Sequence, residues 1–231
     1  MDKAFLPFPR GQTASGINAK DAAPSCSFVN EKGEPLIDAL LGESERGQVL
    51  IATAFLDKAM RGCLAAKFTE EKTTPRLQNR LLGSEKNGGA NAALGTFGVR
   101  IQALRAFGFI SEETYTAIEQ VRKVRNAFAH KDFKITFVSS EVQPYMHKLR
   151  EWLTSVEQMA RYVDPQTGTS IPAWRRDLEL GGQVVNEPVS ESHIFIGATI
   201  MLYTLLANVR WAIRKEEFDG AIRLLANRPA Q

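Results

Sequence analysis

The sequence feature that most constrains the fold is a segment, 44–68, whose apolar residues point in nearly every direction of a helical wheel. A helix that is apolar almost all round is buried among other helices. Ser44 is its expected N-cap, and Glu45 suits the positive end of the helix dipole. The sequence therefore predicts a protein in which this helix is surrounded by others.

Five further segments show helical spacing or helix-start signals. They are 75–82, 96–107, a helix capped by Ser111 that runs to about His130, a helix from Ser140 to about Val163, and a final helix capped by Ser190. One segment, 132–138, alternates apolar and polar residues and is typical of a single extended piece, alone or in a hairpin. We predict an all-α helical bundle of about six helices with at most one short β-hairpin.

Composition divides the chain into four parts. An irregular arm, 1–35, precedes a helical core, 36–163; a connection rich in Pro and Gly, 164–189, is expected on the surface, and a final helix, 190–231, is expected to pack on the core. The apolar run of that helix, 194–209, is shorter than the roughly 20 residues of a membrane span, so we expect a buried core helix and no membrane association. The apolar residues of the final helix point in more directions than a lone surface helix can bury, which also predicts a homodimer.

Charge and composition exclude several classes of site. The net charge of +3 arises from 29 Lys and Arg against 26 Asp and Glu, without the basic surplus of a dedicated nucleic-acid binder. The two cysteines and three histidines show no disulfide or metal-ligand spacing, and no phosphate-binding glycine loop is present. We therefore expect no metal and no cofactor. The N-terminus has no signal-peptide pattern, which favours a cytoplasmic location.

The segment 112–130 predicts an amphipathic helix with an arginine on its apolar side. Arg125 lies about 40° from Val121 on the helical wheel, inside the stripe that faces the core. An unpaired buried guanidinium is costly, so one interpretation is an internal salt bridge to Glu45 or Asp57. In that interpretation His130 only ends its helix near the negative end of the dipole. The core-facing stripe consists of Ala117, Ile118, Val121, Val124 and Phe128.

The alternative is that Arg125 and His130 converge on a phosphate. Arginine offers a planar charged fork to a phosphodiester, and histidine can hold or transfer a proton near neutral pH. Together they could assist attack by a ribose 2′-hydroxyl without a metal. Residues five apart are about 140° apart on a regular helix, so a distortion or a second subunit would be needed. Between Arg122 and Lys134 the chain carries five basic residues against one acid.

The motif RNAFAH, with Arg125, Asn126 and His130, resembles the signature of the HEPN superfamily. That resemblance implies a helical bundle in which such motifs from two subunits meet, often to form a metal-independent ribonuclease. A longer resemblance is to the mannitol operon repressor family, which implies an all-α fold and a regulatory role in a bacterial cytoplasm without the usual helix-turn-helix. It is carried by four blocks in order within 42–137: ESERGQVLIATAFLD, LGTFGVRIQAL, GFISEETY and VRKVRNAFAHKDFKITF.

These observations predict three functions. The leading one is a regulator of the mannitol operon repressor type, which acts in transcription regulation through a protein partner rather than by reading DNA itself. The second is a dimeric HEPN-like endoribonuclease in which Arg125 holds the phosphate, His130 carries the proton and Asn126 orients the site. The third is a catalytically silent module that binds RNA. Its expected RNA-binding residues are Arg122, Lys123, Lys131 and Lys134.

Overall fold

A computed structural model describes residues 40–68, 73–83, 92–130, 134–157, 161–163, 170–172, 174 and 189–226, the last part of which, 216–226, is described by its backbone. Six helices and one pair of short strands occur in these residues, which confirms the predicted all-α bundle. The expected arm 1–35, the loop at 84–91 and most of 164–188 lie outside the described residues. The elements are α2 (Glu45–Lys67), α3 (Pro75–Leu82), α4 (Phe97–Ala106), α5 (Glu112–His130), α6 (Gln143–Glu157), β1 (Arg161–Val163), β2 (Ser170–Pro172) and α8 (Glu191–Ala226).

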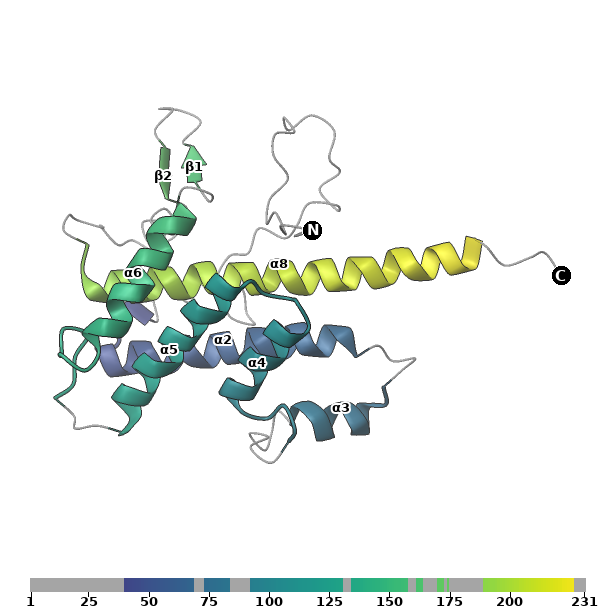
Figure 1. Cartoon of the computed structure of the whole chain (residues 1–231), viewed down its shortest axis with the longest axis horizontal. Coiled ribbons are helices and arrows are strands. Elements are labelled where there is room, and N and C mark those ends of the chain that lie inside the picture. Colours follow the sequence, from purple (N-terminus) through teal and green to yellow (C-terminus); the bar gives the residue numbers. More distant parts are fainter. Residues whose placement is uncertain are drawn as a thin grey trace.

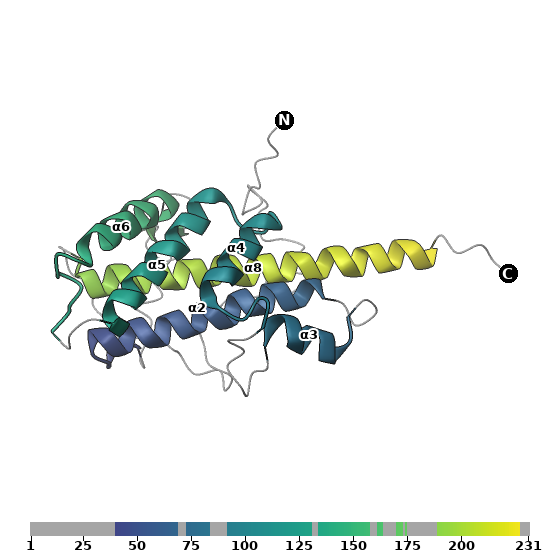
Figure 2. The same ribbon diagram turned by 60° about the horizontal axis from the view of Figure 1, so that its bottom comes forward.

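Helices α2 and α8 form the long axis of the bundle and run side by side in the same direction (Figures 1 and 2). Near their starts, the Ser192 hydroxyl donates to Oε1 of Gln48 at 2.6 Å. Near the end of α2, the Cys63 thiol donates to the Leu206 carbonyl at 3.0 Å. Helix α8 has 36 residues against 23 in α2, so its C-terminal end projects beyond α2.

The apolar run of α8 lies in the core, as predicted. Helices α2, α5 and α6 all pack on α8. A stretch of this helix, Glu191–Lys215, is long and apolar enough to cross a membrane by length and composition alone, and 56% of its most apolar window is buried inside the molecule. Contact with protein therefore accounts for much of this apolar character. The buried residues of the run are Ile194, Phe195, Ile196, Gly197, Ala198, Thr199, Ile200, Met201, Leu202 and Leu206.

The helices begin largely where their capping residues predict. The hydroxyls of Ser44, Ser111 and Ser190 each accept a backbone N–H three residues later, at 3.2 Å. Helix α6 is an exception, because it begins at Gln143 rather than at Ser140. A turn precedes it, and Pro144, which has no N–H to donate, occupies its first turn.

The strand expected at 132–138 is wrong for the part that the structure describes, where 134–138 consists of turns and two residues without regular structure. Phe137 is fully buried, with ring centroids 5.3 Å from Phe128 and 5.1 Å from Phe195. Its N–H donates to Oε2 of Glu45 at 2.6 Å, and its carbonyl accepts from Nε2 of Gln143 at 2.8 Å. Side chains thus satisfy the backbone groups that a neighbouring strand would otherwise pair.

The only strand pair in the described residues lies after α6. β1 pairs antiparallel with β2, with Tyr162 opposite Ile171, so the expected helix does not extend to Val163. The surface position expected for the connection is wrong at Trp174, which is 2% exposed. This ring lies against α8 where Gly197 has no side chain, and a Cβ there would lie 2.6 Å from Cε3 of the indole.

Candidate functional site

Helix α5 presents the expected face to the core but leaves Arg125 outside it. The five residues of the predicted stripe are buried. Arg125 is exposed, and its Nη1 donates to Oδ1 of the adjacent Asn126 at 3.2 Å. The predicted internal salt bridge from Arg125 to Glu45 or Asp57 is therefore wrong. Its position at the edge of the apolar stripe lets the side chain reach the space between α2 and α4.

The buried arginine of this region is Arg100 on α4. Its Nη1 forms a salt bridge with Oδ2 of Asp57 on α2. Its Nε donates to the Leu94 carbonyl at 2.8 Å, and its Nη2 to the Leu82 carbonyl at 3.0 Å. One guanidinium thus joins α2, the end of α3 and the chain that enters α4. Because these contacts fix where α4 begins, they also shape the cavity beside it.

A cavity of about 580 Å³ lies between α2, the N-terminal end of α4 and the polar side of α5. It brings together three of the predicted site residues, Arg122, Arg125 and Asn126. Sequence reasoning did not assign the other walls to a site, although Thr96 is recognisable as a helix cap. These other lining residues are Leu50, Thr53, Ala54, Asp57, Gly95, Thr96, Phe97 and Gly98.

Hydrogen-bond donors gather at the α4 side of this cavity. The Thr96 hydroxyl and carbonyl accept from the N–H groups of Val99 and Arg100. The N–H groups of Phe97 and Gly98 belong to the first turn of α4, where no intrahelical acceptor exists. A Cβ at Gly98 would meet only Cδ of Arg122, at 3.8 Å, so the backbone there is open. The positive end of the α4 dipole therefore faces the cavity.

The charged side chains that line the cavity differ in whether another charged residue already pairs with them. Arg122 is held by Glu119, with Nη2 2.7 Å from Oε2, and this hydrogen bonding raises the pKa of Arg122 above its usual value. Asp57 is held by Arg100, although its Oδ1 has no partner in the described residues. Among the charged groups described in the lining, Arg125 is the one without a countercharge, since Asn126 supplies its hydrogen bond. The cavity thus offers one available guanidinium beside a helix N-terminus.

The other predicted site residues lie elsewhere. His130 is exposed at the C-terminal end of α5 and does not line the cavity. Lys123 lies over the Tyr145 ring of α6, with Nζ 5.7 Å from the centroid. Lys134 is exposed in the turn after α5, and Lys131 lies outside the described residues. Of the predicted basic set, the described Lys123 and Lys134 therefore do not join Arg122 at this cavity.

No family model, curated protein or solved structure matches this chain. The resemblances to the mannitol operon repressor family and to the HEPN superfamily stay predictions. Within the part of the chain that the structure describes, no group of three or more His, Cys, Asp or Glu side chains could hold a metal ion. The candidate site is therefore defined by its geometry, as a cavity with donors on one side and apolar groups on the other.

Proposed function

We propose that this chain is a non-catalytic regulatory module that binds single-stranded RNA, with one nucleotide in the cavity between α2, α4 and α5. A single observation carries this proposal: Arg125, Asn126 and the N-terminal turn of α4 line the same cavity as Leu50 and Phe97. A nucleotide has the matching chemistry, since it joins a phosphate to a flat apolar base.

The phosphate end of the site is supported by the donors. Arginine matches the geometry of phosphate oxygens, and a helix N-terminus adds backbone N–H groups and a favourable dipole. Asn126 accepts from Arg125 through Oδ1, which leaves its NH2 group available to donate. These groups lie where Gly98 keeps the backbone open, so a phosphate oxygen could approach α4 closely.

The base end is supported by the apolar wall. Leu50 is a large apolar side chain that is 43% exposed, and Phe97 is half-buried at the first position of α4. Proteins that recognise single-stranded RNA stack its bases on aromatic rings and apolar side chains. The cavity volume of about 580 Å³ lies within the range of ordinary small-ligand sites, roughly 300 to 1,000 Å³.

Binding is favoured over cleavage because His130 is not at this cavity. The residue follows Arg125 by five positions, which places it about 7.5 Å along α5 and about 140° around it. A proton carrier must come within hydrogen-bond reach of the reacting oxygen. A single chain therefore provides the phosphate-binding arginine without the histidine, and the ribonuclease alternative requires a second copy to supply it.

The proposal is tested by fluorescence anisotropy with a labelled single-stranded RNA at low salt, without divalent metal. We expect Arg125→Gln to weaken binding roughly tenfold, because hydrogen bonds to charged groups contribute about 1.5–3 kcal/mol. Arg105→Gln is the matched control, since this exposed arginine of α4 pairs with Glu112 away from the cavity. Absence of binding by the wild type, or equal weakening by both variants, would overturn the proposal.

The same samples separate binding from cleavage. RNA should stay intact with the wild type. If it is cut, and if Arg125→Ala and His130→Ala both abolish cutting while the variants stay folded, the ribonuclease function replaces the one proposed here. The salt dependence gives a further check, because each phosphate contact on a single strand contributes a slope of about −0.7. A site for one nucleotide predicts a shallow slope.

A second candidate function is regulation through protein association, as in the resemblance to the mannitol operon repressor family. The observation that favours it is the end of α8, which projects past α2 and offers a helix that a second copy or a partner could cover (Figures 1 and 2). A homodimer is expected from this arrangement. Sedimentation velocity tests it directly, and a monodisperse monomer at micromolar concentration would contradict it.

A further inference from the structure

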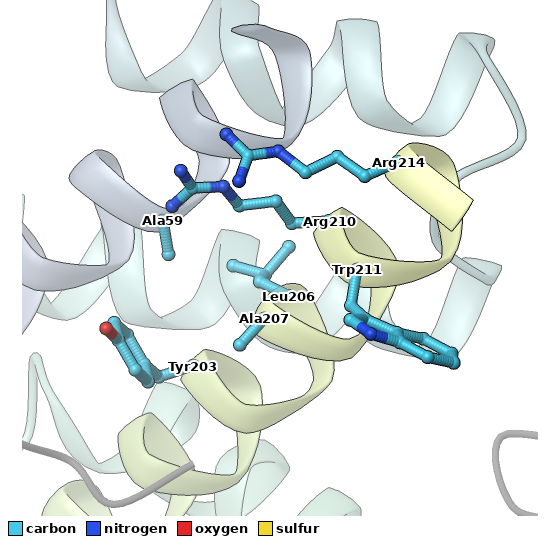
Figure 3. Close-up of a pocket in the computed structure, with 7 residues that line it drawn as sticks. All are labelled: Ala59, Tyr203, Leu206, Ala207, Arg210, Trp211 and Arg214. Atoms are coloured by element: carbon cyan, nitrogen blue, oxygen red, sulfur yellow. The ribbon is translucent and has the colours of Figure 1, made fainter. Parts of the chain in front are cut away.

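A second cavity lies where α8 passes the C-terminal half of α2. Its volume is about 310 Å³, and its walls combine apolar side chains with two arginines (Figure 3). Ala59 of α2 and Tyr203, Leu206 and Ala207 of α8 form the apolar part. None of these residues lines the cavity described above, so the two sites are separate.

Two arginines form the polar end of this cavity. Arg210 and Arg214 are one turn apart on α8, and both guanidinium groups extend toward α2 (Figure 3). Both side chains are exposed, and neither has an ion-pair partner among the described side chains. Like charges four residues apart on a helix repel each other, so an anion that contacts both would relieve the repulsion.

Helix α2 is shaped to receive one of these arginines. A Cβ at Gly62 would lie 3.3 Å from Nη1 and 3.5 Å from Cδ of Arg210. The first distance is tight and the second is an ordinary contact, so the guanidinium lies close on the helix at the point where it has no side chain. The position of Arg210 is therefore set by packing against α2.

Trp211 and Lys215, which neighbour the two arginines on α8, are in contact with each other. Trp211 also lines the cavity, but its ring turns away from the two arginines (Figure 3), and Nζ of Lys215 lies 5.0 Å from the centroid of that ring. Lys215 is therefore a cation on the same helix that does not line the cavity. It provides a matched control for the charge of Arg210 and Arg214.

We propose that this cavity binds an anionic amphiphile, a compound with a carboxylate or phosphate head on a single apolar tail. The head contacts Arg210 and Arg214, which can each offer two parallel N–H groups to such oxygens. The tail lies on the apolar part beside Ala59 and Ala207. This arrangement of a mostly apolar cavity with a few polar groups at one end is typical of small-molecule sites.

The test is isothermal titration calorimetry on the full chain with octanoate and octyl phosphate, both below their micelle concentrations. Acetate shares the head without the tail, and octyltrimethylammonium shares the tail with the opposite charge. We expect at least one of the two anionic amphiphiles to bind, and acetate and the cation to bind at least about tenfold more weakly. Which amphiphile binds more tightly identifies the head as carboxylate or phosphate.

The variants assign binding to the cavity. Arg210→Gln and Arg214→Gln should each weaken binding roughly tenfold, the loss expected for a charged hydrogen bond. Lys215→Gln should change it by less than about twofold, since exposed charges at a distance are screened by salt. Ala59→Leu, which fills the apolar part, should weaken the amphiphile while leaving the weak binding of acetate unchanged. Circular dichroism confirms that each variant is folded.

Three outcomes would overturn the proposal. One is that neither amphiphile binds, or that acetate binds as tightly as octanoate. Another is that the arginine variants bind like the wild type or like Lys215→Gln. The third is that the protein sediments with phosphatidylglycerol vesicles but binds neither soluble amphiphile. That result would assign the arginines to a membrane surface. RNA binding at the other cavity does not enter any of these measurements.

Discussion

Arg100 on α4 and Asp57 on α2 form a salt bridge between a buried and a half-buried side chain. The arginine side chain is 5% exposed and the aspartate side chain is 35% exposed. The same guanidinium donates to the carbonyls of Leu82 and Leu94, so it also joins the end of α3 to the residues that enter α4. The wall of the candidate RNA site therefore depends on a residue that does not line it.

Loss of this guanidinium should destabilise the protein far more than loss of the exposed Arg125. We expect Arg100→Gln to lower the free energy of unfolding by about 2–3 kcal/mol, because it leaves Asp57 unpaired and two carbonyls without a donor. Arg125→Gln should change it by less than about 0.5 kcal/mol, as is usual for exposed positions. Urea unfolding followed by circular dichroism measures both. Equal effects would contradict the assignment of the buried arginine.

The helical-wheel argument that was applied to Arg125 applies equally to Arg100. Only the packing of the helices decides which of the two arginines is buried. On the α4 wheel Arg100 lies about 40° from Leu104, inside the apolar stripe, as Arg125 does on α5. Asp57 does pair with an arginine, but with Arg100 rather than with the predicted Arg125. What the periodicity could not supply is the rotation of each helix about its own axis, which depends on contacts between distant segments. That rotation places Arg100 against α2 and turns Arg125 toward a cavity.

Capping residues predict the starts of helices better than periodicity predicts which side chains are buried, because the hydrogen bonds of a cap are local. Ser44, Ser111 and Ser190 each bond three residues ahead, a contact that needs no tertiary partner. Phe137 shows the opposite case. Its alternation with neighbouring residues indicates a strand, but burial between Phe128 and Phe195 and the bond to Glu45 turn the segment instead. Contacts far apart in sequence decided that conformation.

Gly197 should be intolerant of a side chain. A methyl group there would lie 2.6 Å from Cε3 of Trp174, which is a rigid and buried ring. We expect Gly197→Ala to destabilise by about 1–3 kcal/mol, the cost of overpacking, despite the better helix propensity of alanine. Thermal unfolding measures the change, and altered tryptophan fluorescence should accompany it.

Gly98→Ala is the control for this prediction. Its Cβ would meet only the Arg122 side chain at 3.8 Å, an ordinary contact on α4. Helix propensity should then dominate and raise the free energy of unfolding by up to about 1 kcal/mol. If both alanine variants shift stability in the same direction, the close contact between α8 and Trp174 is not the cause.

Cys63 should be chemically inert in the folded protein. Burial between α2 and α8 raises the pKa of its thiol to about 12, so almost none of the reactive thiolate is present at neutral pH. We expect a Cys26→Ser variant to show no fast reaction with Ellman's reagent when folded and one reactive thiol in urea. Rapid reaction of the folded variant would mean that the α2–α8 contact opens readily.

His193, in the first turn of α8, should make stability depend on pH. Desolvation lowers the pKa of its imidazole in the folded protein, whereas the unfolded chain titrates near the ordinary value of 6.5. As the pH falls through 6.5, the unfolded state binds a proton that the folded state resists, so the free energy of unfolding decreases. Urea unfolding at pH 7.5 and 5.5 measures this loss.

His193→Gln should reduce this loss of stability, while His147→Gln, which removes an exposed histidine beside Glu151, should have a smaller effect. If His193→Gln loses as much stability as the wild type between the two pH values, another group is responsible.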